Sequence, residues 1–155
     1  MSRIKWDEYF FKIVDIVKMR STCKSRQVGS VLVRDNRILA TGYNGAVIGS
    51  KHCSEIDEKC LRKQLNIPSG QRHEICRGVH AEQNVIIQCA KYGIQSKDSI
   101  LYCNISPCSI CLKMLINCEI KIIKFEEFYP DELLFDICKE SGYIIIKNNE
   151  IRKDG

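Results

Sequence analysis

The length, composition and charge of the chain narrow its class before any motif is considered. Its 155 residues suit one domain, spanning 1–155, and 45% hydrophobic and 28% charged residues are ordinary for a globular protein. The 24 basic and 19 acidic residues give a formal charge of +5, which fits a phosphorylated small molecule as a ligand. The basic residues are scattered rather than gathered in one stripe, which argues against a nucleic-acid surface.

The cysteines and the absence of long apolar runs predict a compartment. No run approaches the ~18 apolar residues of a membrane span, and no apolar stretch follows the charged N-terminus as it would in a secretory leader. The ten cysteines are fewer than a disulfide scaffold of this length would carry. We therefore expect a reducing cytoplasm, no membrane partner, and thiols used for metal binding or packing.

The first part of the chain predicts a helix followed by a hairpin. Apolar residues recur at a spacing of three to four over residues 5–19, as on the buried face of a helix. Residues 28–33 and 38–43 are rich in β-formers, and Asp35-Asn36-Arg37 between them is typical of a turn. These two strands are expected to pair at the front of a sheet.

The stretch Gly42-Tyr43-Asn44-Gly45 follows the hairpin directly. Its glycines let the backbone come close to a ligand. Asn44 offers a donor and an acceptor that suit a sugar hydroxyl. Taken alone, the stretch is better explained as an ordinary Asn-Gly turn.

Residues 46–79 form a long segment without clear periodicity. Structureless segments above ~15 residues are uncommon unless they are functional or tied by a metal. Four thiolates would make a closed structural zinc site that holds the segment in place. The expected ligands, with His73 or His52 as substitutes and free thiols as the alternative, are Cys23, Cys53, Cys60 and Cys76.

The second half alternates between helical and strand patterns. A helix begins at Ala81, and Ser106 and Pro107 are expected to act as N-cap and first residue of another. The remaining elements are a helix over 132–141 and strands over 99–103, 121–125 and 143–147, followed by a polar tail over 148–155 that is expected to fray.

Residues 99–125 read as strand, helix and strand. Such a unit makes the two strands parallel with a right-handed crossover. Ligands in open α/β sheets bind beyond the carboxyl ends of the strands. This edge is where Ser106, Pro107 and Cys108 lie, so the topology itself predicts a site there.

Two short motifs carry the candidate chemistry. His80-Ala81-Glu82 and Pro107-Cys108-Ser109-Ile110-Cys111 supply one imidazole, two thiolates and a free carboxylate. Three nitrogen or sulfur ligands leave the fourth position of a catalytic zinc open for water. This H-x-E…P-C-x-x-C pattern is typical of zinc deaminases.

Each motif has a simpler explanation when taken alone. His80 could be a satisfied core histidine, and Cys108 with Cys111 could be a redox pair or buried packing residues. Both motifs in this order, each opening a helix, favour the metal. Zinc lowers the pKa of a bound water to about 7. Glu82, which is not needed as a ligand, can then carry a proton from the water to the substrate.

On these residues the chain resembles the deoxycytidylate (dCMP) deaminases of the cytidine deaminase-like superfamily, in particular the bacterial and phage late-competence-type branch. The resemblance runs from about Trp6 to Tyr143. Besides the two zinc motifs, it rests on Arg20-Ser21-Thr22-Cys23, Val28-Gly29, Gly42-Tyr43-Asn44-Gly45 and Glu119-Ile120-Lys121.

The resemblance implies a three-layer α/β/α fold around a mixed five-stranded sheet, and conversion of dCMP to dUMP for thymidylate synthesis. It implies that Asn44 contacts the deoxyribose, the Ala81 backbone the pyrimidine carbonyl, Ser106 the exocyclic amine, and Tyr129 the 5′-phosphate. The cation for that phosphate is left open, with Arg26 preferred among Arg20, Lys24, Arg26, Arg72 and Arg77.

The resemblance also implies a homo-oligomer, with a hexamer favoured, and allosteric control by dCTP and dTTP, with Mg²⁺ accompanying the triphosphate. A second zinc held by thiols of the long segment is common in the branch. The chain departs from the family's usual residues at Ser30, at Ala46-Val47 and at Asn117-Cys118-Glu119. None of these is a proposed zinc ligand, but they put the allosteric control in doubt.

Three rival functions remain from the sequence. A tRNA adenosine deaminase shares the zinc motif but needs an extended basic surface. A deaminase of free cytidine or deoxycytidine would not need the phosphate contacts. A non-enzymatic, zinc-stabilised module in DNA uptake would gain nothing from the unligated carboxylate of Glu82.

Overall fold

The computed structural model describes residues 1–56 and 59–148, and it contains one mixed sheet of five strands. The strand order is β2-β1-β5-β6-β7. Pairing is antiparallel from β2 (Arg37–Tyr43) through β1 (Gly29–Arg34) to β5 (Ile100–Ile105), and parallel from β5 through β6 (Ile122–Glu127) to β7 (Ile144–Lys147). The expected mixed five-stranded α/β sheet is confirmed, including the hairpin and the parallel unit.

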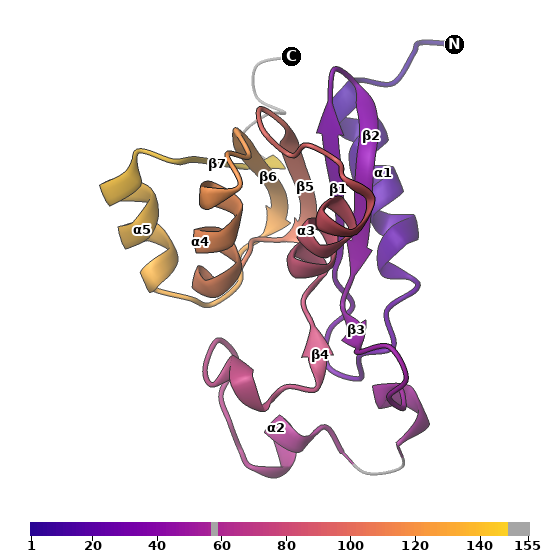
Figure 1. Ribbon diagram of the computed structural model, residues 1–155, viewed down its shortest axis with the longest axis vertical. Coiled ribbons are helices and arrows are strands. Elements are labelled where there is room, and N and C mark those ends of the chain that lie inside the picture. Colours follow the sequence, from indigo (N-terminus) through magenta and orange to yellow (C-terminus); the bar gives the residue numbers. More distant parts are fainter. Residues whose placement is uncertain (57–58, 149–155) are drawn as a thin grey trace.

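Helices cover both faces of this sheet, which makes three layers (Figure 1). Alternation along β1 explains why both faces are apolar: Leu32 joins the core on one side, and Val31 and Val33 join the core on the other. One face packs against α1 (Trp6–Lys18), and the other carries α3 (Ala81–Tyr92), α4 (Ser109–Asn117) and α5 (Leu133–Ser141).

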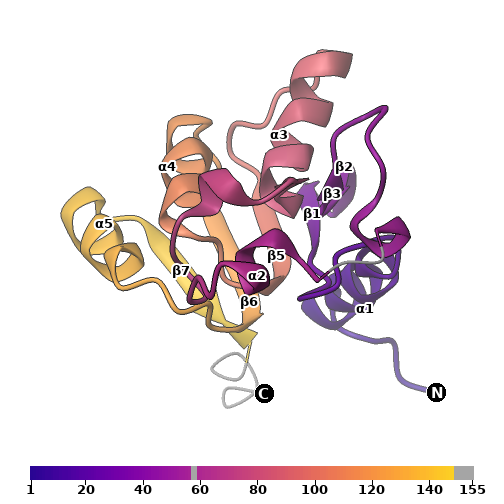
Figure 2. The same ribbon diagram turned by 90° about the horizontal axis from the view of Figure 1, so that it is seen from below.

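The segment between the hairpin and α3 has more structure than its sequence suggests. It contains the short strands β3 (Gly45–Ala46) and β4 (Gly78–Val79), which pair with each other, the 3₁₀ turns η1 (Cys53–Glu55) and η2 (His73–Ile75), and the single-turn helix α2 (Leu61–Gln64). Figures 1 and 2 show it as an excursion beyond one end of the sheet, joined to the body through β3 and β4.

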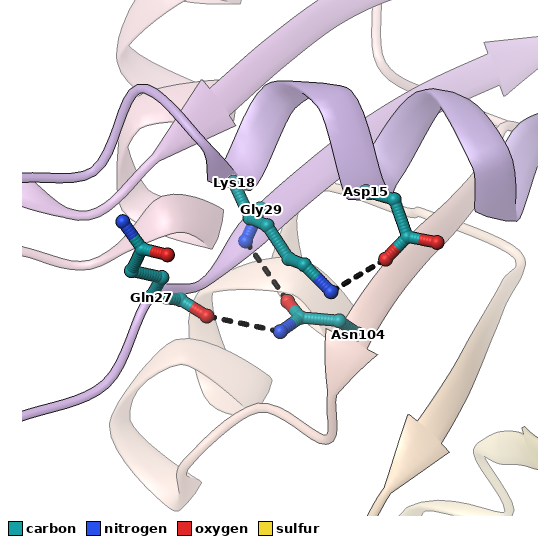
Figure 3. A network of polar contacts seen from close by, with 5 residues as sticks. All are labelled: Asp15, Lys18, Gln27, Gly29 and Asn104. Carbon is teal, nitrogen blue, oxygen red and sulfur yellow. Dashed lines mark hydrogen bonds and ion pairs between the residues drawn. The ribbon is translucent and has the colours of Figure 1, made fainter.

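Asn104 ties the centre of the sheet to the chain before β1. Its Oδ1 accepts from the Gly29 backbone N–H at 2.9 Å and its Nδ2 donates to the Gln27 carbonyl at 3.0 Å (Figure 3). Gly29 also lies flush against α1, since a Cβ there would sit 2.7 Å from the backbone nitrogen of Lys18. These contacts fix the position of α1 relative to strand β5.

Two expectations need correction or limit. The helix after β5 does not begin at Pro107 with Ser106 as its cap: it begins at Ser109, with Cys108 as N-cap residue. The Ser106 hydroxyl is occupied by the Tyr129 backbone N–H at 2.8 Å, and the Asp131 carboxylate accepts from the Ser109 N–H at 2.7 Å instead. The predicted fraying of the tail falls mainly on residues 149–155, which lie outside the described residues.

Candidate metal centre and active site

The start of α3 and the start of α4 bring three donors together. His80 is the N-cap residue of α3, Cys108 is the N-cap residue of α4, and Cys111 lies in the first turn of α4. The His80 Nδ1 atom lies 3.5 Å from the Cys108 Sγ and 3.4 Å from the Cys111 Sγ. His80 is itself oriented by its backbone N–H, which donates to the Gln83 Oε1 at 2.9 Å.

These spacings fit a zinc ion. Zinc bonds of 2.3 Å to sulfur and 2.0–2.1 Å to nitrogen, at tetrahedral angles, place neighbouring donor atoms about 3.5 Å apart. The His80 nitrogen therefore lies at zinc-ligand spacing from each of the two sulfurs, and a zinc ion held by these three side chains would have a fourth position open. One imidazole and two thiols are also a donor set that selects zinc, because harder cations such as Mg²⁺ and Ca²⁺ prefer oxygen ligands.

Glu82 lies beside these donors and is 4% exposed. One donor atom each from His80, Glu82 and Cys111 lies within 4.8 Å of the others. Burial raises the pKa of the Glu82 carboxyl to about 7. A carboxyl with such a pKa can both accept and return a proton near neutrality, which is what a general acid–base group must do.

The electrostatics favour one thiolate before any cation is considered. The contact with the Cys111 thiol, reinforced by His80, lowers the pKa of Cys108 to about 4 despite burial. The same pairing raises the pKa of Cys111, and the contact with Cys108 raises that of His80. Both thiols lie at the start of a helix, where negative charge is stabilised.

A cavity of about 540 Å³ opens onto these residues, a volume within the usual range for small-molecule sites. His80, Glu82 and Cys108 line it, as do Ala81 and Ser106, which are both nearly fully buried. Ala81 is the first residue of α3, where backbone N–H groups have no acceptor within the helix. The cavity thus offers donors at the metal centre and along its walls.

Asn44 lines the cavity but is also part of the framework. Its Oδ1 accepts from the Ser21 hydroxyl at 2.6 Å and from the Val28 N–H at 2.9 Å, and its Nδ2 donates to the Arg26 carbonyl at 2.8 Å. The second Nδ2 hydrogen remains for a ligand. The neighbouring Gly42 allows close approach to protein rather than to ligand, because a Cβ there would meet the Ala81 carbonyl oxygen at 2.2 Å.

Tyr129 and Arg26 contact each other at the wall of the cavity. The Arg26 guanidinium lies 5.4 Å from the centre of the Tyr129 ring, and the Tyr129 hydroxyl accepts from the Gly70 N–H at 2.9 Å. The ring holds the guanidinium by a cation–π contact, and the positive charge of Arg26 suits an anionic group.

Of the other candidate cations, Lys24 and Arg77 line the cavity, whereas Arg20 and Arg72 are exposed and lie outside its lining. Arg62 also lines the cavity, and sequence reasoning missed it. Its Nη2 donates to the carbonyls of Pro68 and Gln71 at 2.8 and 2.6 Å. Its Nε is buried and has no hydrogen-bond partner within residues 1–56 and 59–148. The spacing of a segment without periodicity carries no signal for such a residue.

The four thiols predicted to bind the second zinc line the same cavity. Burial, followed by the charges of Cys23, Cys76 and Cys60, raises the pKa of Cys53. Burial opposes ionisation of Cys60, but the N–H groups of Arg62 and Lys63 outweigh it and lower its pKa. The Gly78 N–H donates to the Cys76 sulfur at 3.4 Å. The structure therefore brings the four sequence-predicted thiols into one region.

The thiols are gathered less tightly than the donors around His80. Among the described residues, the groups of three donors whose atoms all lie within 4.8 Å are His73–His80–Cys108 and His80–Glu82–Cys111. The two histidines proposed as substitute ligands of the second zinc are not placed with these thiols. His52 is exposed, and His73 lies beside the catalytic donors instead.

The sequence of this chain matches a known protein family over most of its length. The family model described as the cytidine and deoxycytidylate deaminase zinc-binding region matches residues 4–127. Within the described part of the chain, none of the helices combines the length and the apolar character that crossing a bilayer requires.

Two curated relatives illustrate the range of the match. ComE operon protein 2 of Bacillus subtilis is 37% identical over 129 residues, which cover 83% of this chain but only 63% of that protein. The deoxycytidylate deaminase of Mycobacterium phage D29 is 33% identical over 135 residues, covering 85% of this chain and 99% of the phage protein.

A solved structure of a related protein has a similar fold. The dCMP deaminase of cyanophage S-TIM5, in complex with dCMP and dUMP, is similar with a TM-score of 0.76 at 25% identity. The match covers 95% of this chain and 99% of that one.

Proposed function

The chain belongs to the cytidine and deoxycytidylate deaminase family through its zinc-binding region, and from this premise we propose that it hydrolyses dCMP to dUMP and ammonia, supplying dUMP for thymidylate synthesis. The observation that carries the proposal is the buried Glu82 carboxyl beside three zinc donors, at one end of a cavity of nucleotide size. Two relatives named above, both matched over nearly their whole length, are deoxycytidylate or dCMP deaminases.

The residues divide the reaction between them. His80, Cys108 and Cys111 hold zinc, which when bound supplies a water of lowered pKa. Glu82 accepts a proton from the water that attacks the amine-bearing carbon, and delivers it to the pyrimidine ring nitrogen. Glu82 then takes the second proton of that water, from the hydroxyl now bonded to the carbon, and gives it to the amine. The carbon–nitrogen bond breaks, the carbonyl of dUMP forms and ammonia leaves. Burial raises the pKa of the Glu82 carboxyl towards the range that suits both directions of transfer.

The cavity walls orient the nucleotide. The Ala81 N–H donates to the pyrimidine carbonyl, Ser106 contacts the exocyclic amine, and the free Nδ2 hydrogen of Asn44 reaches the deoxyribose. Tyr129 and Arg26 receive the 5′-phosphate. Arg62 adds a second cation, because its Nε is buried at the cavity with no partner among the described residues.

An assay of ammonia release from a panel of substrates tests the proposal. The panel contains dCMP, deoxycytidine, dCTP and a tRNA anticodon stem-loop. We expect turnover of dCMP to exceed that of deoxycytidine by orders of magnitude, since the phosphate contacts are lost with the nucleoside. Faster turnover of deoxycytidine or of the RNA would assign the chain to another member of the superfamily. Tight DNA binding without ammonia release would favour the non-enzymatic module.

The second metal, the effectors and the assembly stay predictions. We propose a structural zinc at Cys23, Cys53, Cys60 and Cys76, whose thiols share one region. We also propose a cytoplasmic homo-oligomer, with a hexamer favoured, that responds to dCTP with Mg²⁺ and to dTTP. Exposed Phe128, Leu133 and Phe135, at 46%, 48% and 55%, offer apolar surface for such an assembly. Sedimentation with and without each triphosphate tests assembly and effectors together.

A further inference from the structure

His73 lies at the catalytic donors although it comes from the long segment. It opens η2, well separated in sequence from both zinc motifs. One donor atom each from His73, His80 and Cys108 lies within 4.8 Å of the others. The His73 and His80 rings are 5.2 Å apart between centroids and stand edge to face at 77°. His73 therefore faces the same point in space as the proposed zinc ligands.

Neither ring nitrogen of His73 is accounted for by the rest of the protein. Both are buried, and across the two described stretches neither has a hydrogen-bond partner. A buried polar atom without a partner is costly, so native structures almost always give it a hydrogen bond or a metal. An imidazole with both nitrogens unsatisfied, with a donor atom within 4.8 Å of those of another imidazole and a thiol, has the chemistry of a metal ligand.

The backbone holds His73 in this position from outside the metal centre. The Gly70 N–H donates to the Tyr129 hydroxyl at 2.9 Å, and Gly70 lies so close to Pro130 that a Cβ would sit 2.0 Å from its carbonyl oxygen. Arg72, just before His73, has φ +47°, a left-handed conformation that non-glycine residues rarely adopt. Such a conformation persists when surrounding contacts enforce it.

We infer that His73 is a fourth protein ligand of the catalytic zinc in the nucleotide-free protein, and that nucleotide binding displaces it. Four protein ligands make a closed site, and three make an open, catalytic one. His73 comes from η2, whereas the other three ligands lie at the starts of α3 and α4. With its backbone held in place, the His73 side chain can therefore rotate away from the metal without disturbing them. A nucleotide that fills the cavity favours the open arrangement, because only that arrangement leaves room for water and substrate together.

The inference rests on the zinc centre of the proposed function, and one experiment separates the two. The chain contains three histidines, His52, His73 and His80. With ¹⁵N-labelled imidazoles, NMR of the zinc-loaded protein reports which ring nitrogens bind metal. We expect two metal-bound imidazoles without nucleotide. We expect one at a dUMP concentration beyond which the backbone amide shifts no longer change.

Two variants assign the signals. His73→Gln should remove one of the two metal-bound imidazoles and leave the backbone amide spectrum folded. The matched control His52→Gln, in the same segment but exposed, should retain both. Zinc content is measured on each sample, so that loss of a ligand is distinguished from loss of the ion.

Each outcome has a definite meaning. A single metal-bound imidazole in the nucleotide-free wild type, with zinc present, would overturn the role of His73 and leave the proposed function standing. Two that persist at saturating dUMP would overturn displacement by nucleotide. No metal-bound imidazole at all would overturn the zinc centre itself, and the proposed function with it.

Discussion

Glu82 illustrates how one side chain is tuned by its surroundings. It is 4% exposed and lies beside two thiols and an imidazole, and burial raises its pKa to about 7. A carboxyl in water would be fully ionised at that pH. The same burial that suits it for proton transfer makes it a poor contributor to stability, which is a common cost of functional sites.

Glu82→Gln should abolish turnover and keep the metal. Gln preserves the shape of the side chain but cannot carry a proton, and positioned proton transfer is typically worth on the order of 10²- to 10⁴-fold. Steady-state ammonia release and zinc content are measured on the same sample. The exposed Glu140→Gln serves as control and should keep full activity. An active Glu82→Gln protein would remove Glu82 from the mechanism.

The raised pKa of Glu82 also predicts a pH effect in protein stripped of metal. The folded carboxyl holds its proton up to about pH 7, whereas the unfolded one loses it near 4.5. The folded state therefore binds more protons between these values, and stability falls as pH rises through this window. Glu82→Gln removes the effect and should be more stable than the wild type at pH 8, with a smaller difference at pH 5. Urea unfolding at both pH values checks this, and equal stabilities at pH 8 would contradict it.

Arg26→Gln should weaken the substrate's phosphate contact specifically. Hydrogen bonds to charged groups are worth about 1.5–3 kcal/mol, so KM for dCMP should rise roughly ten- to a hundredfold. KM for deoxycytidine, which lacks the phosphate, should change little. Arg20→Gln is the matched control, because Arg20 is exposed and lies outside the cavity lining. An equal rise in KM for both substrates would place Arg26 away from the phosphate.

Residue spacing predicted part of the site and missed part of it. The motifs identified His80, Glu82, Cys108 and Cys111, because residues two or three apart at a helix start must share a small region. The sequence offered no such constraint for His73 or Arg62. Both lie in a segment whose path depends on long-range contacts such as Gly70 with Tyr129.

At the scale of elements, the beginnings of α3 and α4 are fixed by contacts with the sheet. The Gly42 backbone touches Ala81, and the Asp131 carboxylate accepts from the N–H of Ser109. Periodicity located both helices, but the start of α4 was wrong by two residues. The reason is that the capping acceptor came from the loop after β6 rather than from Ser106, which hydrogen-bonds Tyr129 instead.

Asp7→Asn should lower the free energy of unfolding, because it weakens the contact between α1 and the sheet. The Asp7 carboxylate accepts from the Tyr102 hydroxyl at 2.6 Å and pairs with Lys124 at 2.8 Å, with side chains only 16% and 21% exposed in the ion pair. Loss of such a partly buried charged contact costs about 1–3 kcal/mol. Urea unfolding of the zinc-loaded protein measures it.

The matched control lies on the same helix. Asp15 pairs with Lys18 at 2.5 Å, but these side chains are 48% and 33% exposed, so Asp15→Asn should cost less than about 1 kcal/mol. Equal losses for the two variants would show that the contact of Asp7 with Tyr102 and Lys124 has no special weight.

At the scale of the whole molecule, one cavity connects the zinc motifs with the thiol-bearing segment. The hairpin and the parallel unit followed from periodicity and chain connectivity, whereas the mixed five-stranded sheet was expected from the resemblance and its strand order was not predicted. The excursion over residues 46–79 did not, because its short turns gain their stability from contacts with the body and from any metal it binds.

Removal of metal should therefore act in two steps. We expect two zinc ions per chain by elemental analysis. Loss of the zinc at His80 should abolish activity, and loss of the zinc at the four thiols should lower the thermal midpoint. Mild chelation should remove one of them before the other. Cys60→Ala should show the lower thermal midpoint while keeping the zinc at His80. That variant should lose one zinc and retain His80-centred binding. A single zinc in the wild type would show that the thiols serve packing alone.

Gly42 has a consequence for how damage to this protein would present itself. Any side chain there would collide with the Ala81 carbonyl oxygen and push the start of α3 away from β2. His80 and Glu82, on either side of Ala81, would move with it. A substitution in the hairpin would thus be observed as weaker metal binding. A screen that measures only misfolding would not detect it.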